Sequence, residues 1–449
     1  MITELITIPK TVAQIIGTLE AGGFEAFAVG GCVRDSILGR EVSDWDITTN
    51  ATPEEVSKVF AGKRVLPTGA KHGTVSLMLK GAAYEITTYR IDGNYSDGRR
   101  PDTVRYTNDL NDDLSRRDFT INAMAYNPRT GLADPFGGAE DIKRRLVRCV
   151  GTPDERFGED YLRMMRAYRF AAVLGFDIEP EIRHAVKKNR EKITRIAAER
   201  IRVELDKLIL SGSHDAFLIF MEDLGSVLLP EITRLKDVPQ KNPYHHLDAY
   251  DHTMEVFKYA ENELTQKLCA LFHDTGKAEV MVIDENGETR FPGHAEVSRE
   301  IAYAVLKRLK YDNYRIQAVT AIVRMHNVAK QLSRFAVKRR VHNRGANLTR
   351  QLYTFALADC MGKNSFAQET TLPVLHANIA LLEDVLASGE PIHMTELAVN
   401  GYDVGKALGI RSGEAIGDAL GYLLERVQED PALNEREALL NILCSREKG

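Results

Sequence analysis

The 449-residue sequence has little cysteine, a single tryptophan and no long apolar run. Its cysteines are far apart and form no CxxC pair, which argues against a disulfide framework and favours reduced thiols. No apolar stretch approaches the ~20 residues that cross a bilayer as a helix. The opening residues, MITELITIPK, show no signal-peptide pattern. We therefore expect a cytoplasmic protein with no membrane partner. The five cysteines are Cys32, Cys149, Cys269, Cys360 and Cys444.

An excess of positive charge is also missing. The chain carries 59 basic and 64 acidic side chains, a formal net charge of −5. This balance excludes a protein that binds nucleic acid through its total charge, so any RNA contact must come from local basic clusters. The length suggests roughly three domains. The sequence leaves the oligomeric state open.

The stretch Val29–Asn50, VGGCVRDSILGREVSDWDITTN, concentrates residues that could bind a metal and a phosphate. An apolar run ends at Val29 and predicts a short buried strand. Asp44 and Asp46 are predicted on a second strand, where residues i and i+2 point to one face. Two carboxylates at that spacing suit Mg²⁺, which binds one or two carboxylates together with substrate phosphates.

The Gly-Gly turn supports a phosphate site beside these carboxylates. Gly30 and Gly31 let backbone N–H groups approach an anion without interference from a Cβ, and Arg34 follows one helical turn later. The whole unit resembles the nucleotidyltransferase superfamily that includes DNA polymerase β. Its GGxVRD form, with Leu38-Gly39 before the DxD, is similar to the branch of tRNA nucleotidyltransferases (CCA-adding) and poly(A) polymerases.

This resemblance implies an α+β fold. A polymerase β-like head with a small sheet and helices is expected at residues 1–145. All-α segments should follow: a neck with a nucleotide-selecting helix at 146–240, an HD domain or body at 241–364, and a tRNA-binding tail at 365–449.

Strand-like segments at 63–66, 73–79 and 83–89 complete the predicted head sheet. Glu85 interrupts the apolar choice expected for a core strand. Either it faces solvent or it supplies a third catalytic carboxylate, and the resemblance favours the site.

The segment RIDGNYSDGRRPDTVR, residues 90–105, is rich in glycine, charge and turn-forming residues and predicts a mobile loop. Such composition is usual in a solvated connector. In CCA-adding enzymes of the matching class, a flexible loop here is required for the terminal A step. Its presence therefore favours an enzyme that adds full CCA over one that adds only CC.

The block RRDFTxNA, residues 116–123, matches the second motif of the same family. Adjacent arginines against an aspartate form a group that can meet triphosphate oxygens. The resemblance makes Arg117 and Asp118 nucleotide-binding residues. By itself, the block is an ordinary charged start of a helix.

Residues 155–175 predict one helix with Asp160, Arg163, Arg166 and Arg169 along a slowly drifting face. On an unknown helix, these residues would be surface ion pairs. The pattern EDxxRxxRxxRF, however, resembles the nucleotide-selecting motif of class II CCA-adding enzymes. The later pattern AERIRxEL, residues 198–205, is also family-like, although helix packing is the simpler role for most of it.

The hydrogen-bond donors and acceptors of these side chains explain how the motif can recognise a base. A carboxylate only accepts and a guanidinium only donates. Asp160 can accept from the exocyclic amine of cytosine or adenine while Arg163 donates to the neighbouring ring nitrogen. Uracil and guanine reverse this order, and each mismatch costs about 1–3 kcal/mol. Arg166 and Arg169 are expected to help hold the triphosphate and the helix geometry.

A second set of chemistry-bearing residues spans His245–Asn364. Its histidines and aspartates reproduce an HD-domain ligand series in order, with FHDTGK spelled out. Imidazole and carboxylate ligands suit a first-row transition metal, or Mg²⁺ with fewer histidines. HD domains fused to CCA-adding enzymes either keep phosphohydrolase activity or serve as a scaffold for tRNA. The expected ligands are His252, His273, Asp274, His294, His326 and Asp359.

The tail contains the glycine-punctuated stretch 397–424, with Lys406 and Arg411 adding charge. Backbone N–H groups at a helix start could meet RNA phosphates there, as in the tRNA-contacting tail of Gram-positive-type CCA enzymes. Helix-capping glycines explain the same pattern equally well.

Together these features predict a class II CCA tRNA nucleotidyltransferase that uses CTP, ATP and Mg²⁺ and acts on tRNA, with a possible transition metal in the HD site. Asp44, Asp46 and Glu85 are its predicted catalytic carboxylates. Three alternatives stay open: a poly(A) polymerase, a partial enzyme that adds only CC or only A, and an HD phosphohydrolase whose head merely binds RNA.

Overall fold

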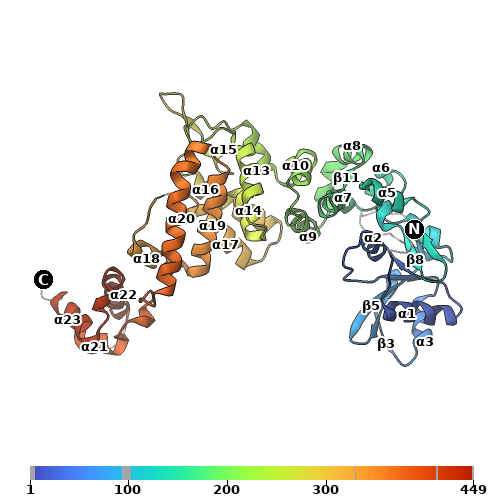
Figure 1. Cartoon of the computed structure of the whole chain (residues 1–449), viewed down its shortest axis with the longest axis horizontal. Helices are drawn as coiled ribbons and strands as arrows, with labels where there is room; N and C mark the ends of the chain where they lie inside the picture. The colour runs from blue at the N-terminus through green and yellow to red at the C-terminus, as the bar shows by residue number, and fades with distance from the viewer. Residues whose placement is uncertain (1–5, 94–102, 329, 411–412, 447–449) are drawn as a thin grey trace. The chain divides into compact units, whose positions relative to one another are not determined.

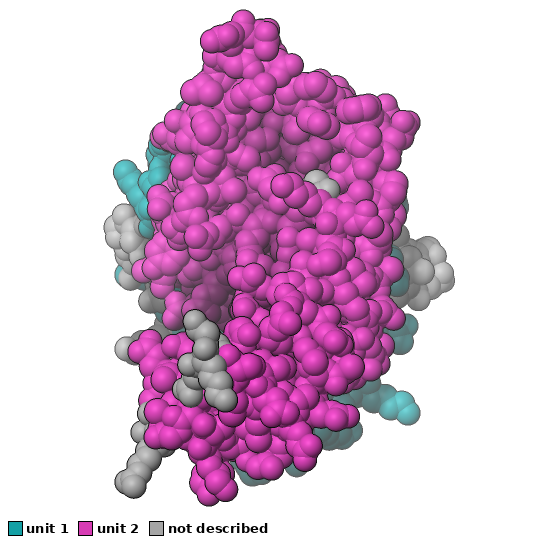
Figure 2. Space-filling model, turned by 90° about the vertical axis from the view of Figure 1, so that its left-hand side faces the viewer, with its two compact units in different colours: residues 1–230 teal, residues 231–449 magenta. Residues whose placement is uncertain are grey.

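The chain forms two compact units, residues 1–230 and 231–449, which Figure 2 colours teal and magenta. The computed structural model describes residues 6–93, 103–328, 330–410 and 413–446. Among these described residues, no helix combines the length and the apolar character needed to cross a membrane. Most of the loop predicted at residues 90–105, and Arg411 of the tail, lie outside the described residues.

A seven-stranded mixed sheet dominates the start of the first unit (Figure 1), with strand order β3-β4-β5-β2-β1-β8-β9. The central strands β1 and β2 pair antiparallel, and β2 runs parallel to β5. Helix α1 packs its apolar side, including Ile15 and Leu19, beneath this sheet, where both side chains are fully buried. The elements are α1 Lys10–Ala21, β1 Ala26–Val29, α2 Gly31–Ile37, β2 Ile47–Thr49, α3 Pro53–Val59, β3 Arg64–Gly69, η2 Ala70–His72, β4 Thr74–Leu79, β5 Ala82–Thr88, β6 Arg90–Asp92, β7 Val104–Tyr106, α4 Leu110–Ser115, η3 Thr120–Asn122, β8 Ala125–Asn127, β9 Gly131–Ala133, α5 Gly138–Arg144 and β10 Leu146–Val147.

The rest of the first unit is almost wholly helical. Helix α7 packs against α9 and α10, and its Tyr168 donates a 2.8 Å hydrogen bond to the buried carboxylate of Asp223. Burial raises the pKa of the Tyr168 phenol, and the Asp223 charge adds to the rise, so this hydroxyl stays protonated. The elements are α6 Pro153–Glu159, α7 Leu162–Leu174, β11 Asp177–Ile178, α8 Pro180–Asn189, η4 Arg190–Arg195, α9 Ala198–Ile209, α10 His214–Asp223, α11 Gly225–Leu228 and, at the boundary, α12 Pro230–Thr233.

The second unit is built mainly of helices (Figure 1), and α13, α14, α17 and α19 pack together around its centre. The expected α+β head followed by α-helical regions is thus confirmed. The elements are η5 Arg234–Asp237, α13 Ala249–Tyr259, α14 Leu264–Phe272, α15 Lys277–Val280, β12 Val282–Ile283, β13 Thr289–Arg290, α16 His294–Arg308, α17 Asn313–Met325, α18 Arg334–Arg344, α19 Ala346–Met361, α20 Ser365–Ala387, η6 Met394–Glu396, α21 Gly401–Leu408, α22 Glu414–Glu429, η7 Pro431–Leu433 and α23 Arg436–Arg446.

The last helices share a small apolar core formed by Val404, Leu423, Val427 and Leu439. Of the tail glycines, Gly409 has a φ of 71° and ends α21 in the left-handed conformation that favours glycine. Helix capping therefore accounts for this glycine.

Candidate active site in the first unit and metal-ligand cluster in the second

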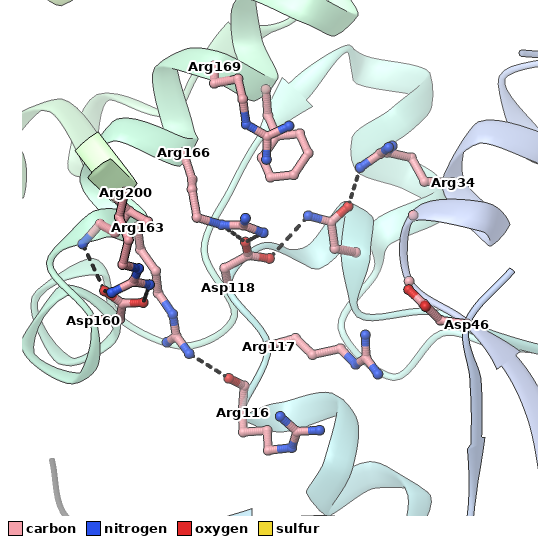
Figure 3. A pocket seen from close by; sticks show the side chains of 15 residues that line it. Arg34, Asp46, Arg116, Arg117, Asp118, Asp160, Arg163, Arg166, Arg169 and Arg200 are labelled. Atoms are coloured by element: carbon pink, nitrogen blue, oxygen red, sulfur yellow. Dashed lines mark hydrogen bonds and ion pairs between the residues drawn. The ribbon is translucent and has the colours of Figure 1, made fainter. Parts of the chain in front are cut away.

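A cavity of about 480 Å³ opens in the first unit between the sheet and the helices that follow it (Figure 3). Arginine dominates its lining, and the carboxylates lie between arginines. Ten residues singled out in the sequence line it: Gly30, Gly31, Arg34, Asp46, Arg117, Asp118, Asp160, Arg163, Arg166 and Arg169.

A second cavity holds the remaining predicted residues of the head. Asp44, Asp46 and Glu85 all line it, so Asp46 belongs to both cavities. Glu85 is solvent-exposed and lies opposite Ser76 in the β4–β5 ladder. Glu85 thus faces water and also lies in the cavity of the two aspartates, and its role as a third catalytic carboxylate stays a prediction.

Negative charge accumulates around Asp46. Partial desolvation raises the pKa of its carboxyl group, Glu85 and Asp44 raise it further, and Arg117 opposes them. Carboxylates that disfavour one another's ionisation are stabilised by a cation between them. The three oxygen donors are also the type that Mg²⁺ prefers, so these residues fit a magnesium site.

The sequence predicts Asp44 and Asp46 on the second strand, but in the structure both aspartates precede that strand. Strand β2 begins at Ile47, immediately after Asp46. The Val29 N–H still donates to the Asp46 carbonyl at 3.0 Å, but β1 ends there because Gly30 turns the chain into α2. No residue of β1 remains to pair with Asp44, so the DxD motif lies in the approach to the strand.

Gly30 is required by its conformation and by its surroundings. Its φ of 83° falls in the region that residues with a Cβ rarely adopt. A Cβ built there would lie 2.9 Å from Nη1 of Arg117. Arg117 is itself fixed by the buried carboxylate of Asp113, 3.3 Å away. The glycine therefore lets this arginine reach the edge of the carboxylate cluster, as Figure 3 shows beside Asp46.

A chain of hydrogen bonds runs across the floor of the cavity. Arg34 donates to the Asn122 side chain at 2.5 Å, and Asn122 donates to Asp118 at 3.1 Å. Asp118 also accepts from Nε of Arg166 at 2.7 Å. Burial opposes ionisation of Asp118, but Arg166 and Arg163 outweigh it and hold the pKa of this carboxyl group well below its usual range. An ionised Asp118 therefore ties α7 to the head.

The predicted continuous helix over 155–175 is wrong. Helix α6 ends at Glu159 and α7 begins at Leu162, with Asp160 extended between them at φ −141° and ψ 106°. The Asp160 side chain accepts a 3.0 Å hydrogen bond from the Leu162 N–H. A short carboxylate that binds nearby backbone competes with the helical bond, which explains the break.

The break changes how Asp160 and Arg163, the predicted base-selecting pair, are presented. Asp160 lies ahead of the helix, and its carboxylate meets Arg200 of α9 at 2.8 Å. Arg163 lies in the first turn of α7, where it pairs with Glu159 and donates a 2.9 Å bond to the Arg116 carbonyl. Figure 3 shows both side chains at one wall of the cavity.

Sequence reasoning did not assign three further residues to the site: Arg200 and Phe170, which line the cavity, and Glu204, which holds one of its arginines. Arg200 holds Asp160, and Glu204 meets Nε of Arg169 at 2.5 Å. Phe170 lies beneath Arg169, with 3.8 Å between the guanidinium carbon and the ring centre. The AERIRxEL pattern could have indicated Arg200 and Glu204, because these two residues are spaced i, i+4 and therefore share one face of α9.

The predicted HD ligands of the second unit meet in its interior. His252, His273 and Asp274 bring ligand atoms within 4.8 Å of one another, and so do Asp274, His294 and His326. Asp359 joins the first set, because its Oδ1 lies 3.2 Å from Nε2 of His252. A cavity of about 560 Å³ reaches this cluster and is lined by Asp274, His294, His326, Asp359, His245, Lys277 and Lys363, among others.

Backbone carbonyls orient the four histidine rings. In each ring, Nδ1 lies 2.7–3.1 Å from a carbonyl oxygen: those of Gly362, Ala270, Phe291 and Val323 for His252, His273, His294 and His326 in turn. A carbonyl only accepts, so Nδ1 carries the proton and Nε2 keeps its lone pair. This is the arrangement by which a protein prepares histidine for a metal.

Burial lowers the pKa of His252 and His294, and it lowers that of His326 to about 3, so these three imidazoles are neutral. Asp274 behaves oppositely. Its burial disfavours the charge, yet the Lys277 ammonium, 2.6 Å from Oδ2, helps to keep the pKa of the carboxyl group well below its usual range. The neutral rings of His252, His294 and His326 beside an ionised carboxylate fit a divalent cation.

Comparison with known proteins identifies the family. Residues 26–148 match the model of the poly A polymerase head domain, residues 175–236 that of the probable RNA- and SrmB-binding site of polymerase A, and residues 248–361 the HD domain. The CCA-adding enzyme of Limosilactobacillus fermentum is 37% identical over 427 residues, covering 95% of this chain and 94% of that protein. The chain belongs to the CCA-adding enzyme family.

Other CCA-adding enzymes agree with this assignment. That of Lactiplantibacillus plantarum is 35% identical, with 98% of this chain and 97% of that protein covered. The enzyme of Lactobacillus helveticus is 46% identical over 230 residues, which is 51% of this chain and 57% of that protein.

Solved CCA-adding enzymes share the architecture. The Bacillus stearothermophilus enzyme in complex with CTP superposes with a TM-score of 0.71, is 28% identical and covers 97% of this chain and 96% of its own. The Thermotoga maritima enzyme complexed with tRNA matches with a TM-score of 0.58 and 20% identity, over 99% of this chain and 97% of its own. At this identity the match shows a shared fold only.

Proposed function

We propose that this member of the CCA-adding family adds C, C and A to the 3′ end of tRNA from CTP and ATP, releasing pyrophosphate in the cytoplasm. The observation that carries the proposal is the single cavity that joins Asp46 and Arg117 to the Asp160–Arg163 pair. One end of that cavity suits a triphosphate and its metal, and the other suits a base.

The reacting end of the cavity holds the phosphates. Asp44 and Asp46, with Glu85 beside them, would hold Mg²⁺ next to the attacking hydroxyl and the α-phosphate. When bound, Mg²⁺ lowers the pKa of the tRNA 3′-hydroxyl and neutralises charge as pyrophosphate departs. Arg117 and Arg34, together with the N–H groups of the Gly30-Gly31 turn, bind the triphosphate oxygens.

The selecting end reads the base by hydrogen bonding. Asp160 accepts from the exocyclic amine of C or A, and Arg163 donates to the adjacent ring nitrogen. Arg200 holds the Asp160 carboxylate in place through a 2.8 Å ion pair. Asp118 and Glu204 fix Arg166 and Arg169, which face the phosphates. The side chains thus replace a nucleic-acid template.

The proposal is tested by stepwise extension of tRNA transcripts that end before CCA, at C or at CC. Each is offered CTP, ATP or both, with Mg²⁺, and the products are separated at single-nucleotide resolution. Addition that completes CCA and then stops supports the proposal. A long A tail indicates a poly(A) polymerase, and arrest after CC or growth only from a CC end indicates a partial enzyme.

We further propose that the second unit hydrolyses phosphate esters with a divalent transition metal held by its HD ligands. The four inward Nε2 atoms and two buried carboxylates favour this second activity over a purely structural role. Lys277 and Lys363 line the adjoining cavity and can hold phosphate oxygens. Water attacks phosphorus, a new P–O bond forms, and the ester oxygen leaves with a proton as an alcohol.

Hydrolysis of p-nitrophenyl phosphate and bis(p-nitrophenyl) phosphate after loading with Mn²⁺ or Ni²⁺ tests this second proposal. Release of p-nitrophenol that disappears in His252→Ala supports it. Equal release by that variant contradicts it.

A further inference from the structure

We infer that a cavity formed by helices α16–α19 of the second unit binds a nucleoside triphosphate, with arginines at its phosphates and an apolar wall at its base. The cavity has a volume of about 610 Å³ and shares no lining residue with the cavity of the histidine cluster. Neither proposed activity uses it. Its lining residues are Arg299, Gln317, Thr320, Ala321, Arg324, Met325, Arg344 and Leu348.

The packing of four helices brings these residues together. Helix α16 packs along α17, and α19 packs against both α17 and α18, all of which are labelled in Figure 1. Arg299 comes from α16, and Arg324 lies in the last turn of α17. Arg344 ends α18, and Gly345, with a φ of 82°, turns the chain into α19, where Leu348 follows. Three helices thus contribute one arginine each.

One carboxylate orients two of these arginines. Glu296 accepts a 2.5 Å hydrogen bond from Nε of Arg299 and lies 2.8 Å from Nε of Arg324. Arg299 also donates to Glu300 at 3.2 Å. A guanidinium carries five N–H donors, so both arginines keep donors for a further acceptor. Guanidiniums held in a fixed direction suit a phosphate group, which they can bind through two parallel hydrogen bonds.

The third arginine carries positive charge that no acid offsets. Partial burial lowers the pKa of Arg344, the charges of Arg340 and Arg324 lower it further, and Tyr353 opposes them. Among the described residues, no carboxylate contributes to this balance. Arg340 instead donates to the Tyr353 hydroxyl at 3.1 Å. Arginine stays protonated in proteins, so an anion in the cavity would relieve the repulsion between these guanidiniums.

The rest of the lining suits a base and a sugar. Ala321, Met325 and Leu348 form an apolar wall, and the flexible thioether of Met325 can adapt to a flat ring. The carboxamide of the exposed Gln317 both donates and accepts, which matches the edge of a base. The Thr320 hydroxyl donates to a backbone carbonyl at 2.7 Å and keeps its lone pairs for a ligand donor.

Size and charge favour a small ligand over an RNA strand. Cavities that bind small molecules typically measure about 300–1,000 Å³, and this one falls within that range. An RNA strand needs basic side chains along its backbone, but the acids Glu296 and Glu300 flank the cavity on α16. Three arginines in a lining without a carboxylate favour several phosphates over one. A nucleoside triphosphate therefore fits best.

Nucleotide counting tests the inference. The full chain is titrated with radiolabelled ATP, CTP and GTP by equilibrium dialysis in EDTA, which withholds metal ions from the head and from the histidine cluster. Arg299→Gln with Arg344→Gln should bind one nucleotide fewer per chain than the unmodified protein. Arg308→Gln with Arg339→Gln removes as many charges from exposed positions of α16 and α18 and should bind the same number as the unmodified protein.

Photolabelling gives a second measurement that needs no variant. The unmodified chain irradiated with 8-azido-ATP should carry the label on a peptide of α17 or α19, in addition to any label in the first unit. Inorganic tripolyphosphate should compete for this site about tenfold more weakly than ATP, because it lacks the base that the apolar wall covers.

Equal nucleotide counts in the two double variants would overturn the inference, as would photolabelling that spares both α17 and α19. Competition by tripolyphosphate as strong as that by ATP would contradict a nucleotide site. If the count is unchanged and tRNA affinity in a filter-binding assay falls only in the Arg299/Arg344 variant, the arginines bind RNA and the inference is wrong.

Discussion

Seven arginines line the cavity of the first unit, whereas histidines, lysines and buried carboxylates line that of the second. In the first, a layer of buried acids lies behind the arginines: Asp113, Asp118 and Glu204 each hold one or two of them. In the second, backbone carbonyls accept a hydrogen bond from Nδ1 of each histidine, so the protonated nitrogen points away from the cluster and Nε2 points into it.

The difference shows how a protein prepares opposite charges for a ligand. Partnered guanidiniums keep their positive charge and a fixed direction, which suits an anion such as a triphosphate. Neutral imidazoles keep inward lone pairs, which suits a cation. Two polar cavities of similar size thus predict different ligands once the second layer of contacts is known.

The largest expected change among single-site variants is a loss of base selection in the first unit. Asp160→Asn replaces a pure acceptor by a side chain that also donates, so uracil is no longer opposed. One mismatch of about 1–3 kcal/mol predicts that the preference for CTP over UTP falls about 5- to 150-fold. Competitive incorporation of the two nucleotides measures it.

The control for this variant is Asp154→Asn, in which an exposed α6 carboxylate bound to Lys188 and Asn189 is changed. It should leave the preference intact. Unchanged discrimination in Asp160→Asn would place selection elsewhere in the molecule.

A smaller effect on nucleotide addition is expected from changing Arg200, the residue that positions Asp160. Arg200→Ala removes the guanidinium that holds Asp160, and a hydrogen bond to a charged group contributes about 1.5–3 kcal/mol. We expect kcat/KM for CTP to fall about tenfold or somewhat more, with partial recovery in Arg200→Lys. Steady-state kinetics on a tRNA lacking CCA provide the comparison.

Lys207→Ala, at an exposed position of the same helix α9, is the matched control and should leave kcat/KM for CTP unchanged. If Arg200→Ala only lowers the melting temperature and kcat/KM per folded molecule is retained, then Arg200 does not position Asp160.

The smallest effect is a pH-dependent stability change confined to the second unit. Hydrogen bonds from Arg334 and Lys338 lower the pKa of Glu390 from 4.5 to about 2. A carboxyl group with a depressed folded-state pKa stabilises the fold above its unfolded pKa, and this stabilisation is lost as pH falls from about 4.5 toward 2.

Glu390→Gln should therefore lower the melting temperature by about 1–3 °C at pH 7, since partly exposed pairs contribute up to about 1 kcal/mol. The difference from the unmodified protein should shrink at pH 3. An equal difference at both pH values would show that the glutamate acts by packing, and transfer at pH 7 should be unaffected in either case.

Much of both sites was predictable because their residues occur in ordered motifs. GGxVRD with DxD, and the histidine series around FHDTGK, locate the two centres without a structure. The head fold followed from the same motifs, and strands at 64–69, 74–79 and 82–88 lie close to the predicted segments.

The remainder depends on contacts between distant residues or on competition within the backbone. The break at Asp160 arises because a side chain outcompetes a helical hydrogen bond, and periodicity alone favours an unbroken helix. Arg200 reaches the cavity, and Glu204 reaches Arg169, only because α9 packs on α7.

The most direct test of the central claim, that nucleotide transfer belongs to the first unit alone, is a side-by-side assay of Asp44→Ala with Asp46→Ala. Loss of the metal-binding carboxylates should reduce CCA addition by about 10³-fold or more, the scale of removing a preorganised catalytic charge. Hydrolysis of p-nitrophenyl phosphate should be unchanged. Persistent CCA addition, or loss of both activities in a folded protein, would contradict the account.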